Sequence, residues 1–198
     1  MSRFTFVPAL SLRGRRSWGP RGFAGKPTHP PLTDLPIAAY LFAAVFDVLS
    51  LIVYDAHPAV GEQLYRAGTW VLLGGAAAAV LAVGTGILDW MTTPPRTQVR
   101  RTANAHWITM VAVNLVVVVD LLLRLTGYRD ETYSEPPIVA LSVLAALLVT
   151  LGAAIGGSLV YDYGMRVEPA ANTTVGREPD RGPGQPDRSP RRRPTDVR

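Results

Sequence analysis

The apolar parts of this sequence contain few side chains that could do chemistry, and most of them are carboxylates or amides. Asp47, Asn114 and Asp120 each interrupt a long apolar run. An ionised side chain at the centre of a membrane-spanning helix costs roughly 2.5 kcal/mol or more, so such residues face protein and take polar partners. The pattern predicts either hydrogen bonds that lock helices together or a polar pathway for protons or solutes.

Histidine is the second type of candidate residue. The sequence has three histidines and no cysteine, which excludes disulfides, thiolate catalysis and cysteine-ligated zinc or iron–sulfur centres. A haem in a helix bundle needs imidazoles on facing helices, and His29 and His106 are the candidate pair. The alternative is that both are hydrogen-bonding residues at a membrane interface. Three histidines with Asp34 or Asp89 do not have the spacing of a known metal site.

Motifs of hydrolytic enzymes are missing from the sequence. It has no Gly-x-Ser-x-Gly elbow, no His-Glu-x-x-His pair and no phosphate-binding loop. We therefore expect no catalytic residues of these kinds and no dedicated metal site.

Four apolar segments must position these polar side chains. They cover about residues 34–54, 69–90, 105–125 and 137–161, and each is long enough to cross a hydrocarbon core of roughly 30 Å. The predicted fold is all-α: a polytopic membrane protein with four transmembrane helices in an up-down bundle. Residues 1–33 form a basic N-terminal tail, 34–165 the transmembrane domain, and 166–198 a Pro/Arg-rich C-terminal tail. Both tails have the composition of disordered segments.

Helical spacing predicts several contacts within this bundle. The first helix should begin after Asp34 as its N-cap. Asp47 and Asn114 lie at similar predicted depth, near the middle of the membrane, so we expect them to approach each other. Asp120 is four residues before Arg124, which favours an ion pair between them. Small residues of the fourth helix should permit close helix packing, namely Gly152, Gly156 and Gly157.

Charge distribution predicts the orientation. The formal net charge is +5, and basic residues concentrate in both tails and in the loop between the second and third helices. The positive-inside rule then predicts that both termini lie in the cytoplasm. The membrane that we expect to hold the protein is the plasma membrane, which is the inner membrane in bacteria. Basic tails are expected to bind anionic lipid headgroups rather than nucleic acid. Six residues should converge at the cytoplasmic end: His29, Asp34, Asp89, Arg101, His106 and Tyr161.

The order of the motifs resembles the DUF2231 family of predicted bacterial membrane proteins. The resemblance covers about residues 29–167, and Asp162-Tyr163 before Gly164 departs from the family pattern. Relatives found beside or fused to Rieske-type iron–sulfur domains imply electron transfer, although this chain has no cysteine of its own. The residues that carry the resemblance are His29-Pro30, Leu35-Pro36-Ile37-Ala38, Asp47, Asp89-Trp90, Arg101, His106, Asn114, Gly156 to Tyr161 and Gly164.

The main expectation for function is a structural or accessory subunit of a membrane complex, in which Asp47 and Asn114 lock the bundle. In that case no cofactor is bound, and the partners are lipid, a second copy or a redox protein. One alternative is an electron-transfer subunit that binds haem b through His29 and His106, or contacts quinone, at the cytoplasmic end. Another is a small proton- or solute-coupled transport subunit that uses Asp47.

Overall fold

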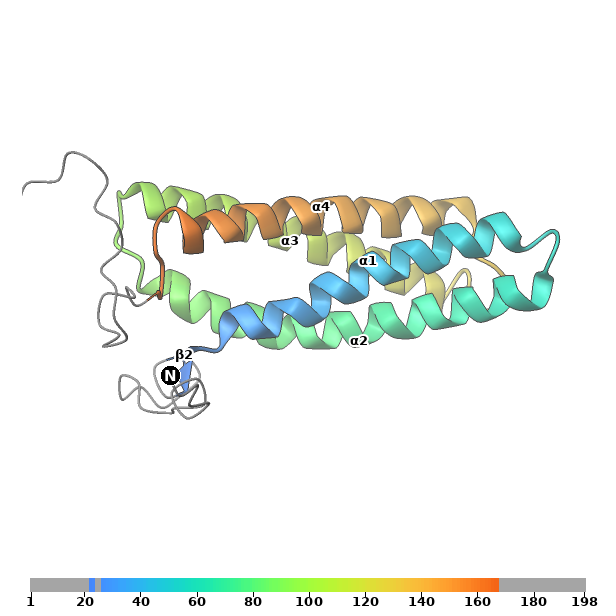
Figure 1. Ribbon diagram of the computed structural model, residues 1–198. Coiled ribbons are helices and arrows are strands. Elements are labelled where there is room, and N and C mark those ends of the chain that lie inside the picture. The colour runs from blue at the N-terminus through green and yellow to red at the C-terminus, as the bar shows by residue number, and fades with distance from the viewer. Residues whose placement is uncertain (1–21, 24–25, 168–198) are drawn as a thin grey trace, which may run out of the picture. The chain divides into compact units, whose positions relative to one another are not determined.

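The computed structural model describes residues 22–23 and 26–167, and this part of the chain is dominated by four long helices (Figure 1). They are α1 (His29–Val53), α2 (Pro58–Met91), α3 (Gln98–Leu125) and α4 (Pro136–Tyr161). Two short strands, β1 (Gly22–Phe23) and β2 (Lys26–Pro27), pair in antiparallel fashion before α1. All four helices are long and apolar enough to cross a membrane, which confirms the predicted all-α membrane fold. The predicted disordered N-terminal tail, residues 1–33, is wrong where it is described, because residues 22–23 and 26–27 form β1 and β2 and residues 29–33 belong to α1. The rest of both predicted tails, apart from residues 166–167, lies outside the described residues.

The first helix begins earlier than the sequence pattern suggested. α1 starts at His29, and no side chain caps its N-terminus at Thr28. The expected cap residue, Asp34, lies inside the helix, as does Pro36. The physical reason is the Pro30-Pro31 pair, because proline in the first turn has no N–H to leave unsatisfied and its φ angle already suits a helix. His29 is thereby fixed on a helix rather than in a loop.

The tryptophans of α2 have the spacing expected for the two interfaces of a membrane. Trp70 and Trp90 are separated by about 30 Å at 1.5 Å of rise per residue, which equals the thickness of a hydrocarbon core. α2 has 34 residues and therefore extends beyond Trp70, where the exposed pair Glu62–Arg66 lies. The polar first turns of α2 form a helix outside the apolar layer, which is why the sequence pattern suggested a loop there.

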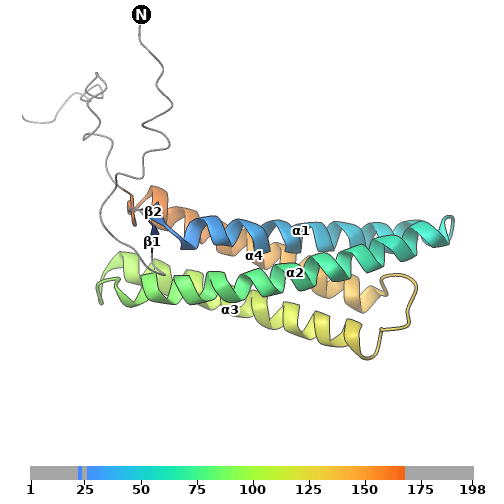
Figure 2. The same cartoon turned by 90° about the horizontal axis from the view of Figure 1, so that it is seen from below.

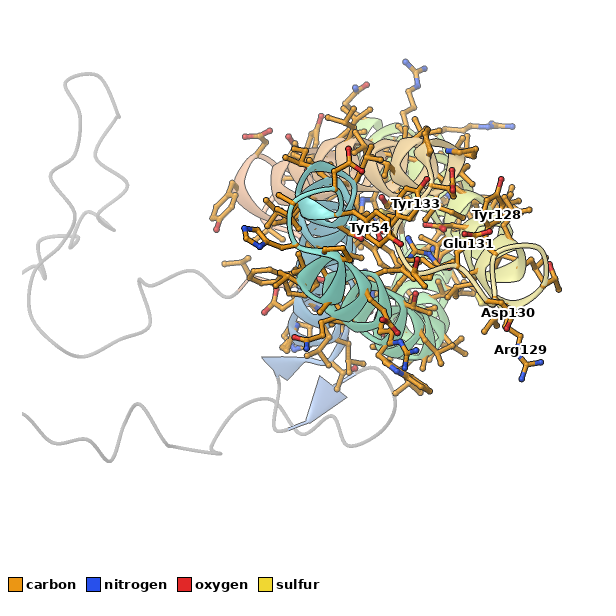
Figure 3. All side chains as sticks on the ribbon, turned by 90° about the vertical axis from the view of Figure 1, so that its right-hand side faces the viewer. Tyr54, Tyr128, Arg129, Asp130, Glu131 and Tyr133 are labelled. Carbon is orange, nitrogen blue, oxygen red and sulfur yellow. The ribbon has the colours of Figure 1, made fainter. Side chains whose placement is uncertain are left out.

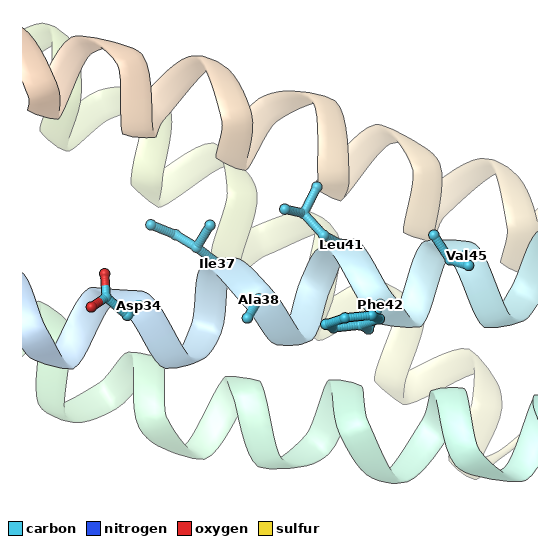
Figure 4. A pocket seen from close by; sticks show the side chains of 6 residues that line it. All are labelled: Asp34, Ile37, Ala38, Leu41, Phe42 and Val45. Carbon is cyan, nitrogen blue, oxygen red and sulfur yellow. The ribbon is translucent and has the colours of Figure 1, made fainter.

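The helices pack as two hairpins. α1 contacts α2 most extensively and α3 contacts α4 next, whereas α2 and α3 contact each other less than α1 and α4 do (Figure 2). Small residues permit the close approach within the first hairpin, because a Cβ at Gly75 would lie 2.5 Å from that of Ala39. The outer face of α1 is apolar, and a shallow groove of about 340 Å³ runs along it past Leu41 and Phe42 (Figure 4). Such a face suits contact with lipid tails.

The two hairpins are copies of one arrangement. α1 and α3 run in the same direction, and buried positions of α1 recur 77 residues later in α3. Buried positions of α2 recur in the same way 70 residues later in α4. The bundle therefore consists of two helical hairpins that bury corresponding positions. The equivalent buried pairs are Pro36/Val113, Tyr40/Val117, Ala43/Asp120, Ala44/Leu121, Asp47/Arg124, Gly68/Ile138, Leu72/Ser142, Gly75/Ala145, Ala79/Val149, Ala82/Gly152 and Asp89/Leu159.

Candidate functional sites at the two ends of the bundle

A buried ion cluster lies at the Arg124 end of the bundle. The Arg124 guanidinium donates to both carboxylate oxygens of Asp47: Nη1 reaches Oδ1 at 3.1 Å, and Nη2 contacts Oδ2. Its Nε donates to Asp120 Oδ1 at 2.7 Å, so the expected ion pair within α3 is formed. All three side chains are shielded from solvent, with exposed fractions of zero. One cation therefore holds two carboxylates from different helices.

Residues of α2 complete the surroundings of this cluster. Arg124 Nη1 also donates to Thr69 Oγ1 at 3.1 Å, and its guanidinium carbon lies 5.5 Å from the centre of the Tyr65 ring. A Cβ at Gly68 would lie 3.1 Å from Asp47 Oδ1, so a glycine at this position leaves room for the carboxylate. Because Thr69 precedes Trp70, the cluster lies near the boundary of the apolar layer rather than at its centre.

The loop between α3 and α4 is tied to the cluster. Ser134 Oγ donates to Asp47 Oδ1 at 2.7 Å, and the Ser134 backbone N–H donates to Ser50 Oγ at 3.1 Å. Tyr65 donates its hydroxyl to the carbonyl oxygen of Tyr128 at 2.8 Å. Figure 3 looks down on this end, where the Tyr54 and Tyr133 rings stack with centroids 4.3 Å apart. The loop thus closes the cluster off from solvent.

Asn114 does not join Asp47. Its side chain accepts from the Tyr40 hydroxyl at 3.4 Å and donates to the Met110 carbonyl oxygen at 2.7 Å. The expected contact is not formed because Asp47 lies near one end of the membrane and takes Arg124 as its partner. Sequence reasoning assigned that arginine only to the acid four residues before it. The signal in the sequence for the contact between Asp47 and Arg124 was Asp47 itself, because an acid within an apolar helix needs a polar or charged partner.

Two imidazoles meet near the opposite end, which we call the His29 end. The ring centroids of His29 and His106 are 6.5 Å apart, and the rings are inclined at 81°. His29 Nδ1 lies 2.9 Å from the Ala82 carbonyl oxygen, and His106 Nδ1 lies 2.8 Å from the Gly152 carbonyl oxygen. A carbonyl only accepts, so Nδ1 carries the proton in both rings. In the neutral form of each ring, Nε2 is then the nitrogen without a proton.

The repeat makes these two imidazoles equivalent. Each histidine lies on the first helix of its hairpin and donates to a carbonyl on the second helix. One turn further along that second helix is a glycine against the ring: a Cβ would lie 2.7 Å from His29 at Gly86 and 3.0 Å from His106 at Gly156. Each histidine is therefore bonded to a backbone carbonyl of the second helix and packs against a glycine one turn further along that helix.

The remaining predicted site residues do not all converge on the histidines. Asp34, Arg101 and Tyr161 are exposed, and within the described residues no contact joins them to either imidazole. Asp89 is buried and forms an ion pair with Arg166, with Oδ1 to Nη2 at 3.3 Å. Among the packing glycines, Gly152 and Gly156 face α3, whereas only Tyr161 of its own helix approaches Gly157. No group of three metal-ligating side chains occurs in this part of the chain.

A further set of polar and aromatic residues lies between α2 and α3 at the His29 end. Trp90 Nε1 donates to Asn104 Oδ1 at 2.8 Å, and the Arg100 guanidinium stacks 3.6 Å above the Trp90 ring. Beside them is an apolar groove of about 370 Å³ that Ile87, Trp107 and Ile108 also line. Sequence reasoning did not single out this aromatic and cationic contact, although the position of Trp90 beside Asp89 indicated an interface.

These features define a class of protein: a four-helix membrane bundle of two like hairpins, with an imidazole pair near one end and a buried ion cluster near the other. The family model of DUF2231, described as predicted membrane protein, matches residues 25–169. The chain therefore belongs to the DUF2231 family of predicted membrane proteins. No curated protein and no solved structure matches it.

Proposed function

We propose that this protein is a membrane electron-transfer protein in which His29 and His106 would hold one haem b between the two hairpins. The observation that carries the proposal is the imidazole pair, with one ring from each hairpin. The expected role as an accessory subunit is compatible with it, since an electron-transfer subunit of a larger complex needs no catalytic residue of its own.

The separation of the rings supports this assignment. Two imidazoles that would hold one metal must lie close together, one from each side of the bundle core. The centroids of His29 and His106 are 6.5 Å apart. Both histidines lie on helices, and a bundle core bounded by facing helices is a common place for a cofactor.

The surroundings of each ring support it as well. A metal-ligating histidine usually donates its other N–H to a carbonyl or carboxylate, which fixes the ring and raises its basicity. The bonds from His29 to Ala82 and from His106 to Gly152 are of this kind. Gly86 and Gly156 lack a Cβ that would collide with the rings, so each imidazole packs directly against the second helix of its hairpin.

The location of the pair suggests which side of the membrane exchanges electrons. His29 and His106 lie close to the Trp90 level, and Arg100 and Arg101 on the first turns of α3 would be the cations available to the two carboxylates of a haem. Following the positive-inside rule, we assign this end to the cytoplasmic side. A bound haem would supply one-electron oxidation and reduction there, and the protein's own residues hold it and exclude water.

The experiment that tests this is a visible spectrum of the protein purified in detergent after expression with added haem. We expect one haem b per chain with the absorbance of a six-coordinate low-spin iron. His29→Ala and His106→Ala should each lose this signature. His57→Ala is the matched control, because His57 is exposed at the other end of the bundle. A wild-type protein without a Soret band would overturn the proposal.

A further inference from the structure

The ion cluster at the Arg124 end contains two acidic side chains and only one basic side chain. Two carboxylates, from Asp47 and Asp120, share a single guanidinium, and no part of the three side chains reaches solvent. If both carboxylates are ionised, one negative charge is buried without a counterion. Buried charges are tolerated only when they are paired, and an ionisable group otherwise becomes neutral.

No other described cation compensates for this charge. Arg66 is tied to Glu62 on the surface, with 71% of its side chain exposed. Arg129, in the loop between α3 and α4, points away from the bundle in Figure 3. The other groups around the cluster are neutral or acidic: Tyr65 from α2, and Ser134 and Glu131 from the loop. Arg124, which lies four residues after Asp120, is therefore the cation for both Asp120 and Asp47.

The hydrogen bonds distinguish the two carboxylates. Asp47 accepts three bonds, two from Arg124 and one at 2.7 Å from Ser134 Oγ. Asp120 accepts a short bond only at Oδ1, from Arg124 Nε, whereas its Oδ2 is 3.4 Å from Nη2. Hydrogen bonds from donors stabilise the ionised form of a carboxyl group, so Asp47 is the better-stabilised anion.

We infer that this cluster is a proton-binding site, in which Asp120 holds one exchangeable proton on Oδ2 while Asp47 and Arg124 form the ion pair. The ligand is a proton, taken up from the solvent at the Arg124 end. The site is independent of the haem proposal, because Asp47 lies about 27 Å from His29 along α1 at 1.5 Å per residue. Protonation leaves the cluster neutral, and release of the proton leaves a buried negative charge beside Ser134.

Infrared spectroscopy of the protein in detergent at neutral pH tests this directly. We expect a carbonyl stretching band of a protonated carboxyl group that shifts in D₂O and on labelling with ¹³C-aspartate. The band should be lost in Asp120→Asn. It should also be lost in Asp47→Asn, because Asp120 then becomes the only anion beside Arg124 and ionises. Asp89→Asn is the matched control for a buried acid and should leave the band unchanged.

Three results would overturn the inference. The first is a wild-type protein with no protonated carboxyl band at neutral pH. The second is a band that survives in Asp120→Asn or disappears in Asp89→Asn instead. The third needs no variant and therefore does not depend on any variant folding: a wild-type band that does not shift with ¹³C-aspartate belongs to another residue type.

Discussion

Arg124→Met should be one of the most destabilising single substitutions in the bundle. The methionine removes every guanidinium bond to Asp47 and Asp120 and leaves the Asp47 carboxylate buried without its cation. Breaking a buried ion pair by removing one partner costs about 3–5 kcal/mol, because the remaining charge stays desolvated. For a chain of this size, such a loss lowers the melting temperature by roughly 6–20 °C.

The assay is thermal unfolding in detergent followed by helical circular dichroism. Arg66→Met is the matched control, because Arg66 also pairs with an acid four residues before it but is exposed. Exposed pairs of this kind contribute about 0–1 kcal/mol, so its melting temperature should change little. The double variant Asp47→Asn with Arg124→Met should recover part of the loss, because it also removes the anion that lost its cation and leaves a protonated Asp120. An Arg124→Met protein as stable as the Arg66→Met control would refute the reasoning.

Two further predictions concern glycines. Gly75→Ala should lower the free energy of unfolding by about 1–3 kcal/mol through overpacking, because its Cβ would lie 2.5 Å from that of Ala39. Thermal unfolding measures this, with Gly74→Ala as the control because a Cβ at Gly74 meets open space. Equal stability of the two variants would contradict the prediction. Gly86→Ala should lower the haem content of purified protein, because the new Cβ would lie 2.7 Å from the His29 ring. Pyridine haemochrome analysis measures that content, with Gly84→Ala, which has open space around it, expected to match wild type.

Local sequence patterns predicted the helices and the contacts within one helix. The four apolar runs and the four-residue spacing from Asp120 to Arg124 depend only on neighbouring residues, so they could be recognised without a fold. The start of α1 differs from the prediction because Pro30-Pro31, whose composition resembles the tail, forms the first helical turn. The start of α2 was missed because its first turns are polar.

Contacts between helices could not be predicted in the same way. Whether Asp47 meets Asn114 or Arg124 depends on how α1 and α3 are rotated and shifted against each other, which the spacing along one helix does not determine. The repeat was hidden because equivalent positions carry different residues, most clearly Asp47 and Arg124. The sequence placed His29 and His106 at one end, but their backbone anchors on Ala82 and Gly152 depend on packing within each hairpin.

The most direct test of the central claim is an electron paramagnetic resonance spectrum of the oxidised, haem-supplemented protein. Imidazole planes inclined at 81° predict the highly anisotropic low-spin ferric signal of nearly perpendicular axial ligands. We expect that signal in the wild type and in His57→Ala, and its loss in His29→Ala and His106→Ala. A low-spin signal that persists in either of the last two variants, or a protein that takes up no haem, would contradict the assignment.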